Sequence, residues 1–196
     1  MILKGLFRPL RYMLKMIDKS EKVIVIAAME RELPPGEGAV ATGFGRAKTK
    51  KTLEGVIADR KPSLVISVGL VGAVIPELKV GDIFIPEKIV DYDRPEREYI
   101  VQYPINKSGV LVTVPRVFHK KDKINLKKRI PAAAAVDMET AAVAEVLSSR
   151  KIPLLCIKAV SDDLEFDLHN HKLLRAGIDT AIKSYTEYLT RFLHIR

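Results

Sequence analysis

Ser63-Leu64-Val65-Ile66-Ser67-Val68, followed at once by Gly69-Leu70-Val71-Gly72-Ala73, is the stretch that decides the fold of this chain. Pro62 precedes it and ends a helical pattern, because the residue before a proline is disfavoured in a helix. The apolar run predicts a buried strand over residues 63–68, and the glycines predict a Gly-rich strand end. Ligands of α/β sheets bind outside the carboxyl ends of strands, so this strand end is a candidate site.

Strand and helix patterns alternate on both sides of this stretch. The continuous β-branched run Lys22–Ala28 is typical of a strand covered on both faces. Further strands are expected over 38–43, within 80–86, over 110–114 and over 154–160, and the section between 87 and 109 is less regular. Helices are expected from about residue 45 to 60, near 120–128, over 137–149 and at the C-terminal end. The alternation predicts an α/β fold.

The composition fits one well-cored domain, since 47% of the 196 residues are hydrophobic and 29% are charged. The net charge is +9, and basic residues gather in the N-terminal segment, in 46–51 and in 119–129. None of these runs has the interleaved aromatic residues of a base-stacking surface, so we expect solvent-facing helices and no nucleic-acid partner. The single cysteine, Cys156, lies in an apolar run, which excludes a disulfide framework and indicates a reducing, cytoplasmic setting.

Residues 1–21 form a separate segment before the predicted domain of residues 22–196. Apolar residues from Leu3 to Ile17 recur at helical spacing, with lysines and arginines on the other side. The segment is too charged to span a bilayer and lacks the cleavage site of a secretory signal. Two interpretations are open: a helix packed on the domain or on a subunit partner, or residues 1–20 lying on an anionic membrane surface.

Polar or Gly-rich residues follow four of the predicted strands. They are Met29-Glu30-Arg31-Glu32, Thr42-Gly43-Phe44-Gly45, Gly69-Leu70-Val71-Gly72-Ala73 and Ser161-Asp162-Asp163. Between the last two, Val136-Asp137-Met138-Glu139 stands at the head of the predicted helix over 137–149, which otherwise looks buried. Each pattern alone is common, but their order along the chain is specific. We therefore expect carboxylates to converge on one pocket.

In this order the residues resemble the nucleoside phosphorylase and nucleosidase superfamily, whose members cleave or exchange the N-glycosidic bond of nucleosides. The most similar branch is hydrolytic: methylthioadenosine and adenosylhomocysteine nucleosidases, futalosine hydrolases and hopanoid-associated nucleosidase-like proteins. The resemblance rests on residues 69–73 with 78–83, on 136–139 and on 158–162, and extends over about residues 22–166. It implies a shortened, cofactor-free member with a three-layer α/β/α fold around a twisted mixed central sheet.

The resemblance implies roles for three of these side chains. Asp162 matches the acid that hydrogen-bonds or protonates the purine at N7, Glu139 the carboxylate that accepts hydrogen bonds from the ribose hydroxyls, and Met138 the thioether packed against the sugar. The chemistry agrees, because bond cleavage puts negative charge on the base and two carboxylate oxygens suit a vicinal diol. The alternatives are a turn-capping Asp162 and a helix-dipole role for the first-turn acids, which explains Asp137 better than Glu139.

Glu32 matches the acid that activates the attacking water in nucleosidases, as one of two carboxyls does in glycosidases. Family members usually have several tens of residues between this acid and the Thr-Gly-x-Gly segment, whereas only residues 33–41 intervene here. We therefore expect Glu32 to lie in a loop that is rebuilt relative to the family, where Glu30 is the alternative acid.

The phosphorolytic members have a sequence similar to Arg-Val-Gly-Ser at the strand end. This chain has Ser67-Val68-Gly69-Leu70 at the same place. A phosphate dianion without its arginine is poorly held, which favours hydrolysis, although Arg31 or Arg46 remains available. The resemblance also places four consecutive residues and two further ones at the substrate: Gly69, Leu70, Val71, Gly72, Ser161 and Phe118. Phe118 is either the purine-stacking ring or a core residue.

The sequence predicts no metal site, because its histidines lack Cys or acid partners at ligand spacing, apart from a His169-x-His171 pair. We expect a nucleosidase that hydrolyses the N-glycosidic bond of a purine nucleoside or 5′-thio-nucleoside, without a cofactor. The alternatives are a phosphate-dependent phosphorylase and a shortened non-catalytic relative that binds nucleosides or serves in an assembly. Relatives are dimers or larger rings, so the resemblance also implies a homo-oligomer.

Overall fold

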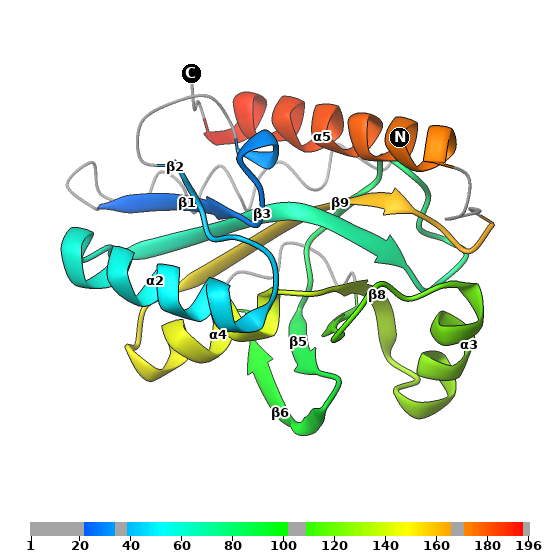
Figure 1. Cartoon of the computed structure of the whole chain (residues 1–196), viewed down its shortest axis with the longest axis horizontal. Coiled ribbons are helices and arrows are strands. Elements are labelled where there is room, and N and C mark those ends of the chain that lie inside the picture. The colour runs from blue at the N-terminus through cyan, green and yellow to red at the C-terminus, as the bar shows by residue number, and fades with distance from the viewer. Residues whose placement is uncertain (1–21, 34–38, 102–108, 166–170, 194–196) are drawn as a thin grey trace.

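The computed structural model describes residues 22–33, 39–101, 109–165 and 171–193, and Figure 1 labels its elements. The strands of these ranges are β1 (Val23–Ala27), β2 (Ala39–Ala41), β3 (Leu64–Ala73), β4 (Ile83–Phe84), β5 (Lys88–Asp91), β6 (Arg94–Ile100), β7 (Val110–Thr113), β8 (Ala133–Asp137) and β9 (Leu154–Asp162). The helices are the short 3-10 helix η2 (Glu30–Glu32) and the α-helices α2 (Arg46–Arg60), α3 (Lys120–Arg129), α4 (Thr140–Ser149) and α5 (His171–Leu193).

All these strands belong to one mixed sheet in which β3 is central. The order is β2-β1-β3-β8-β7-β5-β6, and β9 pairs with both β3 and β4. β3 pairs in parallel with β1 and with β9, and its last residues pair antiparallel with β8. The α/β class and the mixed sheet predicted from the sequence are confirmed.

Successive side chains of β3 enter two different cores. Val65 and Val71 pack in one cluster with residues of α2 and α4, whereas Ile66 and Val68 pack in another with Tyr185 of α5. This is the two-residue period of a strand covered on both faces. Figure 1 shows α5 on one side of the sheet and α2 and α4 on the other. The expected three-layer arrangement is therefore present.

The predicted strand end at Gly69–Ala73 is wrong, because β3 continues through it to Ala73. Pairing with β9 runs from Val65 to Gly72, with a register shift between Val71 and Gly72. Gly69 has φ +139°, a backbone conformation that favours glycine. The glycines thus mark an irregularity inside a strand rather than its end, which fits the role of isolated glycines in strands.

The predicted helix over 137–149 begins too early. Ala133–Asp137 is strand β8, and helix α4 starts only at Thr140. Alanine is depleted in strands, so the alanine run carries little strand signal, but pairing with β7 and β3 buries every residue of β8. Asp137 therefore ends a strand and does not lie in a helical first turn.

The section between 87 and 109, expected to be less regular, contains the antiparallel pair β5 and β6. Six of the seven residues of β6 are either exposed or charged, so no alternation of apolar residues reveals it.

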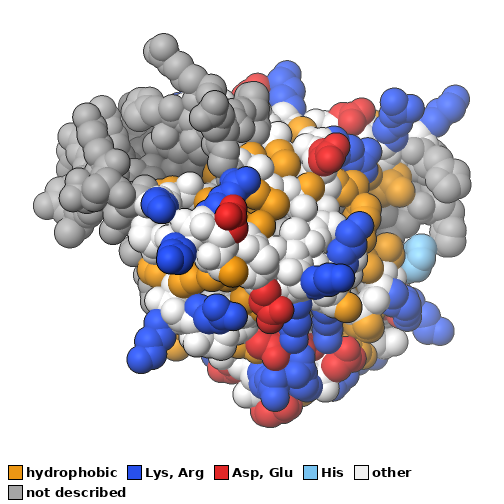
Figure 2. Space-filling view, turned by 60° about the vertical axis from the view of Figure 1, so that its left-hand side comes forward, with side chains coloured by type: hydrophobic (Ala, Val, Ile, Leu, Met, Phe, Trp, Pro, Cys, Tyr) orange, Lys and Arg blue, Asp and Glu red, His pale blue; other side chains and the backbone are white. Residues whose placement is uncertain are grey.

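The N-terminal segment 1–21 lies outside the described residues, so its helix and the boundary at residue 22 stay predictions. Within the described ranges, no helix is long and apolar enough to cross a membrane. Figure 2 shows Lys and Arg side chains spread over the visible face, with Asp and Glu among them. This distribution fits the expectation of solvent-facing basic residues.

Candidate active site

One cavity of about 510 Å³ lies among β1, η2, β3, β8, β9 and α5. It is lined by all ten residues that the sequence singles out: Glu32, Gly69, Leu70, Val71, Gly72, Phe118, Met138, Glu139, Ser161 and Asp162. Its volume is in the usual range of small-molecule sites. The structure thus brings these residues to one place, and their chemical roles stay predictions.

Glu32 is a buried acid on one wall of this cavity, with 3% of its surface exposed. Its Oε2 accepts a hydrogen bond of 3.2 Å from the Met29 amide, and its backbone carbonyl accepts one from the Tyr185 hydroxyl of α5. These contacts anchor the short helix η2 on the domain. Desolvation by burial raises the pKa of Glu32, although Lys158 opposes the shift. The alternative acid, Glu30, is exposed and does not line the cavity.

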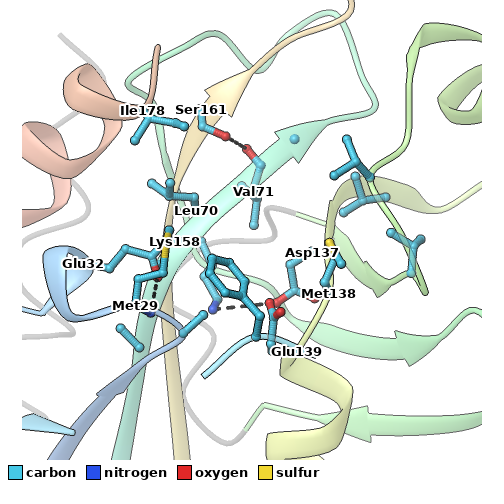
Figure 3. Close-up of a pocket in the computed structure, with 18 of the residues that line it drawn as sticks. Met29, Glu32, Leu70, Val71, Asp137, Met138, Glu139, Lys158, Ser161 and Ile178 are labelled. Atoms are coloured by element: carbon cyan, nitrogen blue, oxygen red, sulfur yellow. Dashed lines mark hydrogen bonds and ion pairs between the residues drawn. The ribbon is translucent and has the colours of Figure 1, made fainter. Parts of the chain in front are cut away.

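Lys158 is a cavity residue that the sequence analysis did not single out. Its Nζ donates to Ser67 Oγ and to the Val68 carbonyl, both at 3.3 Å, and lies 3.7 Å from Asp137 Oδ2. Figure 3 shows this ammonium group between Glu32 and Asp137. Burial alone lowers the pKa of Lys158, but nearby groups, Cys156 and Asp137 foremost, outweigh burial and raise it. A lone lysine within the apolar run 153–160 is the signal that marks it.

Glu139 stands between β8 and α4, at the residue that precedes the helix. Its Oε1 accepts a hydrogen bond of 3.0 Å from the amide of Gly45, so the Gly43-Phe44-Gly45 turn and the Asp-Met-Glu segment meet here. Desolvation by burial, followed by repulsion from Asp137, raises the pKa of Glu139 to about 7. The place of Glu139 at the N-terminal end of α4 is compatible with the helix-dipole alternative, and its place on the cavity wall with the ribose role.

Asp137 has a structural role in this loop. Its Oδ1 accepts a hydrogen bond of 2.7 Å from Thr113 Oγ1, and its Oδ2 accepts bonds from the Thr140 amide at 3.1 Å and from the Thr140 hydroxyl. With these donors and Lys158 nearby, its oxygens hold β7, β8 and the start of α4 together. Asp137 thereby fixes the direction in which Met138 and Glu139 point.

Asp162 lies at the other end of the cavity, at the last residue of β9. Its Oδ1 accepts a hydrogen bond of 3.1 Å from Ser161 Oγ, and its Oδ2 is in an ion pair with Lys123 of α3. Lys123 is 2% exposed and is a second basic residue that the sequence analysis did not single out. Lys123 belongs to the strongly charged helix α3, whose sequence is typical of a solvent-facing segment. The sequence therefore gives no sign that this lysine is buried.

Phe118 belongs both to the core and to the cavity wall. It is 6% exposed, packs edge-on against Tyr92 with ring centroids 5.3 Å apart, and has the Arg116 guanidinium 5.2 Å from its centroid. Both alternatives that the sequence left open for this ring are thus compatible with its position. Phe44 and Val117 also line the cavity and are 61% and 55% exposed, which makes its mouth apolar.

The two arginines considered as anion ligands differ in position. Arg46 binds Asp91 at 2.8 Å and Asp93 at 3.0 Å and is not among the lining residues. Arg31 lines the cavity. Among the described residues, no group of three or more His, Cys, Asp and Glu could hold a metal ion. His169 lies outside the described residues.

Comparison with known proteins decides the family. The family model described as "Phosphorylase superfamily" matches residues 36–107 and 103–194. The chain belongs to the phosphorylase superfamily. Within this superfamily, the chain is 29% identical over 153 residues to the 5′-methylthioadenosine/S-adenosylhomocysteine nucleosidase of Buchnera aphidicola subsp. Acyrthosiphon pisum, an alignment that covers 63% of this chain and 66% of that protein. It is 25% identical over 178 residues to the same-named nucleosidase of Haemophilus influenzae, covering 75% and 78%.

Solved structures share the fold of this chain. The Helicobacter pylori futalosine hydrolase superimposes with a TM-score of 0.74 at 18% identity, covering 89% of this chain and 97% of that one. The Streptococcus pneumoniae MTA/SAH nucleosidase in complex with 8-aminoadenine gives a TM-score of 0.72 at 21% identity, covering 89% and 100%. These structural alignments cover most of this chain, whereas its sequence aligns with only 66% of the Buchnera relative's length.

Proposed function

We propose that this protein is an N-ribosyl hydrolase that cleaves the N-glycosidic bond of a purine nucleoside or 5′-thio-nucleoside. The observation that carries the proposal is the convergence of Glu32, Glu139 and Asp162 on one largely apolar cavity. The nucleosidase names of the aligned relatives support the same chemistry.

In the proposed mechanism the two ends of the cavity serve the two products. Asp162 faces the purine and helps it leave as negative charge builds on the ring. Glu139 accepts hydrogen bonds from the ribose hydroxyls in its ionised form, and Met138 beside it packs against the sugar. The bond to the base breaks as positive charge develops on the ribose, and the carboxylates stabilise that charge.

Glu32 is proposed as the general base for the attacking water. Its raised pKa makes it a better proton acceptor than an ordinary glutamate, and its hydrogen bonds with Met29 and Tyr185 hold it in place. A Cβ built on Gly69 would lie 3.5 Å from both Glu32 Oε2 and Lys158 Nζ, so both groups border this glycine. The water would attack the ribose from the face opposite the base.

Phosphorolysis is the second candidate, because three cationic side chains, Arg31, Arg116 and Lys158, line the cavity. Lys158 already has close acceptors and acidic neighbours, and Arg116 is in an ion pair with Asp122, which weakens both as phosphate ligands. Hydrolysis is therefore preferred over phosphate transfer.

The test is to incubate the protein with a panel of adenosine, inosine and their 5′-methylthio analogues, with and without phosphate, and to identify the sugar released. Free ribose or 5-methylthioribose at a rate independent of phosphate supports hydrolysis. Phosphate-dependent ribose 1-phosphate supports the phosphorylase. Ligand-induced thermal stabilisation without turnover supports the non-catalytic nucleoside-binding relative.

Three further properties are proposed with it. We propose a homo-oligomer, since Phe44 and Val117 leave an exposed apolar rim at the cavity, and light scattering after gel filtration tests this. We propose a cytoplasmic location, which the free and buried Cys156 supports and cell fractionation tests. For residues 1–21 we propose a separate basic helix before the domain, and vesicle flotation with and without residues 1–20 tests whether it contacts membranes.

A further inference from the structure

Lys123 is buried although its helix is strongly charged. It is 2% exposed, whereas Lys121 and Lys128 of the same helix are exposed. Lysine is almost never fully buried unless it is paired, and the partner here is Asp162, whose Oδ2 forms an ion pair with Lys123 Nζ. The pair joins α3 to the end of β9, at the proposed purine end of the cavity.

The ion pair fits at the cavity wall because Gly72 has no side chain. A Cβ at this position would lie 2.8 Å from Asp162 Oδ2 and 2.9 Å from Lys123 Nζ, closer than real Cβ atoms come. Gly72 and Asp162 line the cavity, and Lys123 lies directly behind them. A ligand at this wall would therefore meet Asp162, with the ammonium group of Lys123 on its far side.

This arrangement bears on where the proton for the leaving purine comes from. Asp162 is the anionic member of an ion pair, and its other oxygen accepts a hydrogen bond from Ser161. A carboxylate in this state has no proton of its own to donate. Within the pair, the ammonium group of Lys123 holds the available acidic proton.

We propose that Lys123 is a positioning residue that supplies, through Asp162, the proton that the purine takes at N7 as it leaves; this rests on the proposed nucleosidase function. As the bond between the sugar and the base breaks, its electron pair goes to the purine. N7 takes a proton from the Asp162 carboxyl group, which takes one from Lys123 Nζ, leaving a neutral amine. Water adds to the sugar and gives a proton to Glu32. Exchange with solvent then protonates Lys123 and deprotonates Glu32.

A purely structural ion pair makes a different prediction. An anchor between α3 and β9 would affect every substrate equally, since it would act on the shape of the cavity. A proton source would affect only substrates whose leaving group needs a proton. Purines need one, whereas p-nitrophenolate leaves without one because it is a stable anion.

The experiment compares a purine nucleoside that the wild type cleaves with p-nitrophenyl β-D-riboside, in wild type, Lys123→Met, Lys123→Gln and Lys123→Arg. In Lys123→Met and Lys123→Gln, kcat for the purine nucleoside should fall about 100-fold or more, with KM little changed, because proton transfer belongs to the transition state. The rate on the phenyl riboside should change by less than about threefold. Lys123→Arg keeps the cation but not a proton that it can readily give up, so the purine activity should fall in this variant as well.

Lys121→Met is the matched control, since Lys121 is an exposed lysine of the same helix, and it should leave both rates unchanged. Equal losses on both substrates, or no loss on the purine nucleoside, in any Lys123 variant that melts like wild type would overturn the proposal. Should Lys123→Met fail to fold, Lys123→Gln and Lys123→Arg carry the same comparison. A wild type that releases no sugar from any nucleoside instead overturns the proposed function itself.

Discussion

The two ends of the cavity both contain buried acids, but the acids are stabilised in different ways. At the ribose end, Glu32 and Glu139 have no direct ion pair with any residue that the structure describes, and burial raises the pKa of both, that of Glu139 to about 7. At the purine end, Asp162 is in direct contact with the buried cation Lys123. Burial without a contacting cation favours the protonated acid, whereas burial against one favours the carboxylate. The ribose end is therefore sensitive to pH near neutrality, and the purine end depends on the integrity of a pair.

The largest effect is expected from breaking the purine end. Asp162→Asn removes the carboxyl group and leaves the buried ammonium group of Lys123 without an anionic partner, so kcat/KM should fall by about 10³-fold and unfolding should become about 3 kcal/mol easier. Steady-state kinetics and thermal unfolding measure the two changes. Asp163→Asn is the control, because this neighbouring acid does not line the cavity. It should change neither kcat/KM nor the stability. Unchanged sugar release in Asp162→Asn would show that the purine leaves without this acid.

Glu32→Gln tests the water-activating wall of the ribose end. An amide keeps the size of the side chain but accepts no proton from water, so kcat should fall by about 10²-fold while KM changes little. Kinetics under saturating substrate measure this. Glu30→Gln, at the exposed acid of the same short helix, should behave like wild type. A loss in Glu30→Gln equal to that in Glu32→Gln would return the role to the alternative acid.

Glu139→Gln tests the proposed hydrogen bonds from the ribose hydroxyls to Glu139. A hydrogen bond to a charged group contributes about 1.5–3 kcal/mol, so its replacement by a neutral one should lower kcat/KM by roughly tenfold or more on ribosides. The loss should shrink for 2′-deoxy nucleosides, which lack one of the hydroxyls that Glu139 would bind. A variant with equal losses on ribo- and deoxyribonucleosides would refute this contact. Glu54→Gln on the exposed face of α2 is the control.

The smallest effects are pH dependences of the ribose end. The pKa of Glu139 is about 7 in the folded protein, above its ordinary value of 4.5. Between these values the folded state binds more protons than the unfolded state, so the contribution of this group to stability falls as pH rises from 4.5 to about 7. Relative to Glu139→Gln, the wild type should therefore lose stability as pH rises across this range, and thermal unfolding of both proteins measures the difference.

Activity should follow the opposite trend, because Glu139 must be ionised to accept the hydrogen bonds of the ribose hydroxyls. We expect kcat/KM of the wild type to rise with pH through about 7 and this limb to be absent from Glu139→Gln. A pH profile of both proteins measures it. The same limb in Glu139→Gln would assign the titration to another group, with Glu32 the first to examine.

The sequence by itself determined the fold class and ten residues of the cavity wall. Apolar runs such as Val23–Ala27 and Leu154–Val160 predicted strands of a covered sheet, and the polar residues near their carboxyl ends marked the edge where ligands bind. Order along the chain then pointed to Glu32, Glu139 and Asp162, which line one cavity. Local pattern failed at β8, where an alanine run carries little strand signal, and at Gly69–Ala73, where glycines lie inside β3.

The tertiary structure alone decided the partners of these acids. Lys123 stands among solvent-facing lysines in the sequence, and nothing local shows that it is the one turned inward to Asp162. Lys158 is marked only as a lone charge in an apolar strand, and its neighbours Glu32 and Asp137 come from distant parts of the chain. Periodicity reports which face of an element is buried. Which charges meet there depends on how the elements pack, and that packing sets the protonation of the site.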